Sequence, residues 1–234
     1  MTPPTIDQIE HYCNDLVSSW KENYAKKNYK ECLELSQKFI TNLKPIYNDR
    51  LYGDTDQAKE SYSCMYIFMI LSKSFEDVIK LVELTANKNW PNDQAKTESI
   101  WQVLWDAKER LDIFNSHCRN KNLFKFLLQQ LKKLEHCFYD LFGKGIYMSP
   151  VILVKKASCS ICGLNIKGCA HIPGYLYDGK PCKEIAEDFE IQGADIVQSP
   201  HDMRCRVWPW NFIDESRVNV RIMNLNKLDD FIKN

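Results

Sequence analysis

The sequence predicts a mainly α protein, in which an all-α N-terminal domain is followed by a smaller α+β domain. Apolar residues recur at helical spacing over most of residues 5–142. Seven of the eight glycines lie at or after residue 143, and short β-prone runs separated by turn signals follow. This change in composition places a helical domain at 1–145 and an α+β domain at 146–234.

Local signals divide the N-terminal domain into helices. Thr5 and Gln8 have the spacing of a capping box, which predicts where the first helix begins. Pro45 is expected to end the second helix, Ser74 to cap the fourth, and Gly143 to stop the last. The six expected helices cover about residues 6–25, 29–44, 55–71, 74–90, 92–115 and 120–142.

The C-terminal domain is expected to contain short strands. The clearest is Arg217–Ile222, because its apolar residues alternate with polar ones, as in a half-buried strand. Pro173-Gly174, Asp178-Gly179 and Ser199-Pro200 are turn signals between β-prone runs. The other expected elements are strands within 151–154, 188–198 and 204–208, and a closing helix over 225–233.

The ten cysteines fall into two groups with different expected roles. Five are scattered along the helical region and are expected to be small core residues: Cys13, Cys32, Cys64, Cys118 and Cys137. The other five lie within 47 residues: Cys159, Cys162, Cys169, Cys182 and Cys205. This crowding indicates a metal site, not a disulfide scaffold spread over the chain.

Cys159, Cys162, Cys169 and His171 are the expected metal ligands. The Cys-x-x-Cys pair followed by Gly163 resembles Cys/His zinc-knuckle modules, in which one tight turn directs two sulfurs at one ion. Four thiolate and imidazole ligands suit tetrahedral Zn²⁺, and a thiolate-rich site of this kind is typically structural. Cysteines that are reduced and bind no metal are the alternative.

Other residues compete for the fourth position, and the pattern also bears comparison with catalytic zinc sites. Cys182 competes with His171, while Cys205 and His201 are more distant candidates. Zinc deaminases also combine such ligands, but they require a glutamate two residues after the first ligand, where this chain has Pro173 after His171.

Two stretches of the helical region resemble the second helix of a tetratricopeptide repeat. Residues 29–33 and 75–79 share an order of aromatic, acidic and apolar residues, and each precedes a proline sixteen residues after its aromatic, Pro45 and Pro91. The copies lie 46 residues apart, so irregular helical hairpins are expected instead of a regular array.

Arg110 and His117 lie seven residues apart and therefore on one face of the expected fifth helix. An Arg–His pair late in a helical domain resembles the HEPN ribonucleases. The resemblance implies that these two residues would be catalytic in metal-independent RNA cleavage. A solvated arginine and a histidine at a helix end are the alternative.

Two tryptophans and two arginines lie close together between residues 204 and 210. Trp208 and Trp210 are expected to fill the core, with an aromatic docking surface as the alternative. Arg204 and Arg206 are expected to be solvated strand-edge arginines, with contact to phosphate as the alternative.

The best functional hypothesis is a non-enzymatic adaptor, in which helical hairpins and a zinc-stabilised surface engage a protein partner. Lys+Arg and Asp+Glu number 31 each, so there is no surplus of positive charge and a nucleic-acid reader using the zinc domain is the weaker alternative. The longest apolar run has about half the length needed to span a bilayer and no leader is evident, so a cytoplasmic protein is expected.

Overall fold

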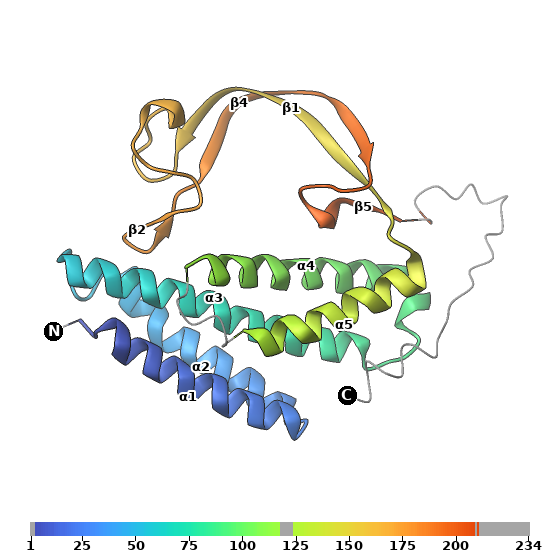
Figure 1. The fold of residues 1–234 in the computed structure, drawn as a ribbon, viewed down its shortest axis with the longest axis horizontal. Coiled ribbons are helices and arrows are strands. Elements are labelled where there is room, and N and C mark those ends of the chain that lie inside the picture. The colour runs from blue at the N-terminus through green and yellow to red at the C-terminus, as the bar shows by residue number, and fades with distance from the viewer. Residues whose placement is uncertain (1–2, 118–123, 209, 211–234) are drawn as a thin grey trace.

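The computed structural model of the chain describes residues 3–117, 124–208 and 210, and within them an all-α domain precedes a small α+β domain. The helices are α1 (Ile6–Ala25), α2 (Tyr29–Asn48), α3 (Asp56–Thr85), α4 (Gln94–His117) and α5 (Lys125–Phe142). They form a bundle, and a long two-stranded ribbon arches over it (Figure 1). The predicted fold class is confirmed.

Several helix ends form as the sequence predicts. The Thr5 side chain accepts from the Gln8 N–H and the Gln8 side chain accepts from the Thr5 N–H, which completes the capping box. Gly143 follows the last residue of α5, and its N–H donates to the Tyr139 carbonyl. These ends depend on side chains a few residues apart, so local sequence is sufficient to predict them.

Two predicted helix boundaries are wrong. Pro45 lies inside α2, where only the last turn of the helix follows it and the Asp49 N–H donates to its carbonyl. Ser74 does not cap a new helix, because its hydroxyl donates to the Ile70 carbonyl within the continuous helix α3. The bundle therefore has five described α-helices instead of six.

The continuity of α3 also bears on the helical-repeat resemblance. The second copy of the pattern, residues 75–79, lies in the second half of α3, and Pro91 falls in the 3₁₀ helix η1 (Trp90–Asn92). A pair of helices does not form there, and the resemblance to tetratricopeptide repeats is not confirmed.

The core is centred on α3, which contributes many of the buried residues. Phe68, Phe75 and Ile79 on α3 are buried, and the Phe75 ring stacks on that of Trp20 with centroids 4.6 Å apart. Cys13, Cys32 and Cys137 are buried in this core, as expected, while Cys64 is half-buried and Cys118 lies outside the described residues.

The ribbon consists of two antiparallel strands of fourteen residues, β1 (Ile146–Cys159) and β4 (Glu184–Val197). The short strand β5 (Arg206–Val207) pairs with the start of β1, which gives the order β4-β1-β5. The 3₁₀ helix η3 (Met203–Cys205) precedes β5. The predicted strand 217–222 and helix 225–233 lie outside the described residues.

Arg206 fastens this end of the ribbon to the bundle. Its guanidinium donates to the Phe142, Gly143 and Lys144 carbonyls, at 3.0, 2.8 and 3.3 Å. It also lies over the rings of Trp101 and Trp208. Only 6% of Arg206 is exposed, so the expectation of a solvated arginine is wrong for this residue.

The two tryptophans at the end of the described chain belong to the same anchor. The Trp208 and Trp210 rings stack with centroids 5.0 Å apart and pack against Phe142. The indole N–H of Trp210 donates to Glu98 over 2.5 Å. The core-filling interpretation is confirmed for Trp208, which is buried, while Trp210 is half-buried and packs against it.

Candidate metal centre and adjoining cleft

A tight knuckle begins where β1 ends. The Gly163 N–H donates to the Cys159 carbonyl over 2.8 Å, and the Cys159 N–H donates to the Leu164 carbonyl over 2.8 Å. Gly163 has a φ of 71°, which glycine adopts without the steric penalty of a side chain. The Ile161 N–H points back at the Cys159 sulfur, 3.4 Å away. The turn therefore presents both sulfurs of the Cys-x-x-Cys pair on one side.

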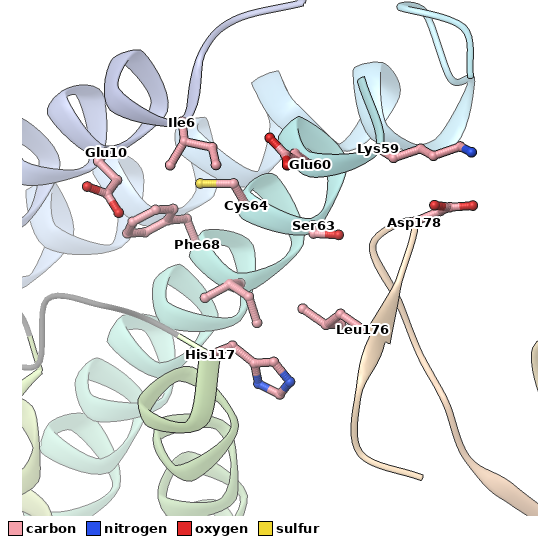
Figure 2. Close-up of a pocket in the computed structure, with 11 residues that line it drawn as sticks. Ile6, Glu10, Lys59, Glu60, Ser63, Cys64, Phe68, His117, Leu176 and Asp178 are labelled. Carbon is pink, nitrogen blue, oxygen red and sulfur yellow. The ribbon is translucent and has the colours of Figure 1, made fainter. Parts of the chain in front are cut away.

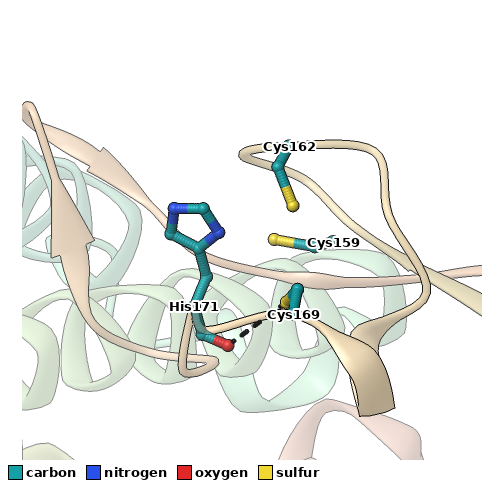
Figure 3. A group of neighbouring side chains, drawn as sticks. All are labelled: Cys159, Cys162, Cys169 and His171. Atoms are coloured by element: carbon teal, nitrogen blue, oxygen red, sulfur yellow. Dashed lines mark hydrogen bonds between the residues drawn. The ribbon is translucent and has the colours of Figure 1, made fainter.

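The four predicted ligands come together in space. The ligand atoms of Cys159, Cys162, Cys169 and His171 all lie within 4.8 Å of one another, and Figure 3 shows the four side chains converging on one point. Sulfurs bound to one tetrahedral zinc at ~2.3 Å lie roughly 3.8 Å apart. The cluster could therefore hold a metal ion after a small contraction.

His171 is oriented as a ligand would be. Its ring meets the Tyr177 ring edge-on with centroids 4.5 Å apart, and the Tyr177 hydroxyl accepts from the Ile172 N–H. Its Nδ1 is buried and has no hydrogen-bond partner among the described residues. A buried polar atom without a partner is costly, and a metal ion at the cluster would satisfy it.

Cys182 lies beside the cluster, although it is not one of the four mutually close donors. Its sulfur is 3.7 Å from that of Cys159. Its backbone is fixed by two hydrogen bonds, from Cys182 N–H to Tyr175 O and from Gly174 N–H to Cys182 O. A small displacement of the Cys182 sulfur would therefore bring it to the ion in place of His171.

The thiols of the cluster differ in acidity. Loss of hydration opposes ionisation of Cys159, but donors at Cys162 N–H, Ile161 N–H and the Cys182 thiol outweigh it and lower the Cys159 pKa to about 6. Loss of hydration and the hydrogen bond to Cys159 raise the pKa of Cys182 to about 11. The lowered pKa favours the thiolate form of Cys159, which is the form that binds metals.

The remaining candidates lie elsewhere. Cys205 donates to the Asp202 carbonyl in η3, and β5, which follows it, pairs with the start of β1 at the end opposite Cys159. The fourteen residues of β1 between these ends have a contour length of roughly 43 Å. His201 is an exposed residue just after β4. Neither belongs to the cluster of described ligands.

A short hairpin carries the metal cluster onto the bundle. Its strands are β2 (Leu176–Tyr177) and β3 (Lys180–Pro181), joined by Asp178-Gly179. The φ angles of 51° and 77° at this dipeptide are those of a type I′ turn, which confirms the predicted turn.

Contacts from α2 and α3 hold this turn. The Tyr47 hydroxyl donates to the Gly179 carbonyl over 2.8 Å, and the Gly179 N–H donates to Ser63 Oγ over 2.9 Å. Arg50 donates to the Asp178 carbonyl over 2.7 Å. Sequence reasoning did not identify these contacts, since only the Asp-Gly dipeptide marked the turn and nothing marked its partners on the helices.

Gly179→Ala is expected to destabilise this docking. A Cβ at Gly179 would lie 2.9 Å from the backbone carbonyl group of Tyr62, and the left-handed conformation adds strain. We expect about 2–4 kcal/mol lost from the free energy of unfolding in urea.

Gly174→Ala is the matched control. Gly174 also has a positive φ, of 87°, but nothing lies within 4 Å of its Cβ position. It should cost only about 1–2 kcal/mol, the conformational strain. Equal losses in the two variants would contradict the close packing of Gly179.

A cleft lies where the hairpin meets α1, α3 and the end of α4, with a volume of about 440 Å³. Figure 2 shows Leu176 and Asp178 of the hairpin facing Ser63 and Lys59 of α3. Its apolar lining comes from Ile6, Ile67, Phe68 and Leu176. Its charged lining comes from Glu10, Lys59, Glu60 and Asp178. This volume falls within the range of ordinary ligand sites.

Arg110 and His117 are each engaged in structural contacts. Arg110 forms an ion pair with the buried carboxylate of Asp77. His117 has Nδ1 2.9 Å from the Ile113 carbonyl and Nε2 3.1 Å from the Gly174 carbonyl. His117 therefore connects α4 to the metal module, and no contact joins it to Arg110 among those described.

Asp77→Asn is expected to change how stability depends on pH. Burial raises the Asp77 pKa to about 6, against the opposing effect of Arg110. The folded protein therefore keeps this proton at pH values where the unfolded chain has lost it, so the contribution of Asp77 to stability falls as pH rises from about 4 to 6.

The asparagine variant lacks this loss. Its free energy of unfolding, relative to wild type, should rise by about 2 kcal/mol over that pH window. Urea unfolding at several pH values measures the difference. A difference that stays constant with pH, or falls, would contradict the buried state of this carboxylate.

The fold and the site define a helical protein with a Cys/His cluster that could hold a metal ion. None of the described helices has the length and apolar character to cross a membrane. The chain matches no protein-family model, no curated protein and no solved structure.

Proposed function

We propose that the protein is a zinc-stabilised binding protein that holds a segment of a partner protein in the cleft beside the metal module. The observation that carries the proposal is the position of this cleft. One wall is the α1–α3 surface, and the other is a hairpin attached to the Cys/His cluster.

Zinc is the ion that fits the donor set. Three thiolates and one imidazole are soft or borderline ligands that favour zinc over magnesium or calcium. Four protein ligands leave no open coordination position, so the ion would be structural. Its role would be to hold residues 159–183 together and so to fix the hairpin that forms one wall of the cleft.

The cleft lining indicates the chemistry of the partner. Phe68, Ile67 and Leu176 offer an apolar floor, while Glu10 and Glu60 place carboxylates at its sides. A segment with an apolar side chain next to a basic one would match both features. Arg110 and His117, the pair of the ribonuclease alternative, are held in other contacts, the first by Asp77 and the second by the Ile113 and Gly174 carbonyls.

The test is a binding measurement on cleft variants. A partner captured on the wild-type chain is purified, and its affinity is measured for Glu60→Lys, for Cys64→Trp and for the control Glu31→Lys, which reverses the charge of an exposed residue on α2. We expect the cleft variants to weaken binding at least about tenfold. Binding that is unchanged by both cleft variants would refute the proposal.

A further inference from the structure

The side of the ribbon that faces away from the helices is apolar along its middle. Tyr147 and Val197 form a cross-strand pair that packs on the bundle core, so side chains of β1 alternate from there between the bundle side and the outer side. This alternation continues to Val154, because the extra residue at the first register shift, Gln192, lies on β4. The outer side therefore carries four cross-strand pairs: Met148–Ile196, Pro150–Ala194, Ile152–Ile191 and Val154–Phe189.

The eight residues of this outer side are all apolar, and all are exposed in the part of the chain that the structure describes. The exposed fractions of Ile191 and Phe189, for example, are 66% and 52%. Together the eight side chains present roughly 600 Å² of surface, which is as large as the largest apolar patch on an ordinary monomer. An apolar face of this size normally marks a contact with another molecule.

A second copy of the chain matches this face. A two-fold contact brings the same patch of two copies together, so the patch must be complementary to itself. A wholly uncharged apolar face meets that condition, and interfaces between identical chains are more apolar than transient ones. The ribbon arches over the bundle with its outer side directed away from the helices (Figure 1), so the bundles of two copies would lie on opposite sides of the contact.

The area of the face sets the expected strength of such a contact. Two faces packed together would bury about 1,000 Å², which is the smallest area usual for a specific interface. The contact would also give each ribbon a second layer, about 10 Å away, and a two-stranded ribbon is only marginally stable without one. Because the interface is small, we expect a weak dimer that forms at micromolar concentrations.

The charges of the ribbon disfavour two other contacts. Strand β4 carries five acidic residues, and β1 carries two lysines, Lys155 and Lys156, which pair with Glu190 and Glu187. Two positive charges against five negative ones leave the ribbon with a net charge of −3, which an anionic membrane surface would repel. Pairing of the β4 edges of two copies is opposed as well, since β4 contains no lysine or arginine to offset its carboxylates.

We propose that two copies of the chain pack face to face through the outer side of the β1–β4 ribbon, with Ile152, Val154, Phe189 and Ile191 in the contact. The dimer would consist of two layers of strands with one helical bundle on each outer side. This inference rests on the ribbon alone and does not depend on the metal ion or on the partner proposed for the cleft.

Sedimentation equilibrium of the full chain under reducing conditions tests the proposal. The wild type is expected to pass from monomer to dimer between about 1 and 500 µM. Ile152→Lys should weaken the dimer at least about tenfold, because it places a charge from each copy inside an apolar contact. Ile191→Lys, which changes the residue opposite Ile152 on β4, should weaken it to a similar degree.

Leu153→Lys is the matched control. Leu153 follows Ile152 in β1 and is equally exposed, at 45% each, but it lies on the bundle side of the ribbon, opposite Glu190. This variant should dimerise as the wild type does. Circular dichroism and thermal unfolding of the three variants show whether each remains folded.

Two results would overturn the proposal. One is a wild-type chain that stays monomeric up to the highest concentration, whether its outer face then remains free or binds another protein or phosphatidylcholine vesicles. The other is a dimer that all three variants weaken equally, or that none of them weakens, which would place the contact elsewhere. A dimer that Ile152→Lys and Ile191→Lys weaken and Leu153→Lys leaves unchanged supports the contact through the outer side.

Discussion

Cys162→Ser is expected to lower zinc affinity more than about 100-fold, because even residues that only orient metal ligands change affinity by roughly 10–100-fold when they are replaced. Cys162 is an exposed member of the cluster, so its substitution removes little packing. Loss of the ion should release residues 159–183 while the helical domain keeps its helices. Competition with a chromophoric chelator measures the affinity, and circular dichroism follows the helices.

Cys205→Ser is the control for this experiment. Cys205 donates to the Asp202 carbonyl, and a serine hydroxyl can do the same. This variant should bind zinc as the wild type does. A zinc affinity of Cys162→Ser equal to that of the wild type would contradict the assigned ligand set.

The same assay distinguishes the two candidates for the fourth ligand. With His171 as the ligand, His171→Ala should weaken binding strongly, whereas Cys182→Ser should weaken it by about tenfold at most, since Cys182 then only donates to the Cys159 sulfur. The reverse order would show that Cys182 replaces His171 at the ion.

Arg206→Met is expected to lower the free energy of unfolding by about 3–5 kcal/mol. The substitution removes a charged donor to three carbonyls around the end of α5, and a hydrogen bond to a charged group contributes about 1.5–3 kcal/mol. It also removes the cation from between Trp101 and Trp208. Methionine keeps much of the side-chain volume, so the loss reports mainly on the polar and cation–π contacts.

Arg204→Met is the matched control two residues away. Arg204 pairs with Asp106, Glu109 and Asp202 in a more exposed position. Exposed ion pairs contribute little, so this variant should cost about 1 kcal/mol. If urea unfolding shows that both variants lose the same free energy of unfolding, Arg206 does not anchor the ribbon to the bundle.

The parts of the fold that could be predicted from sequence are those set by neighbouring residues. The capping box at Thr5, the Asp178-Gly179 turn and the Cys159-x-x-Cys162 knuckle each depend on groups a few positions apart. The convergence of Cys169 and His171 with that knuckle also followed from their short separation in the chain.

The features that escaped prediction depend on long-range contacts. Arg206 finds its acceptors more than sixty residues earlier, at Phe142–Lys144, so nothing local distinguished it from a solvated arginine. The docking of Gly179 between Tyr47 and Ser63 joins positions more than one hundred residues apart. The continuity of α3 through Ser74 is the local exception, because the Ser74 hydroxyl donates to the Ile70 carbonyl four residues earlier instead of capping a new helix.

The most direct test measures the metal content of the full chain. The protein is purified under reducing conditions and its metals are determined by elemental mass spectrometry. The account predicts about one zinc ion per chain, and a chelator that lowers the melting temperature of residues 159–183 in a residue-resolved measurement. Protein that holds no stoichiometric metal, or a metal module whose melting the chelator leaves unchanged, would contradict it.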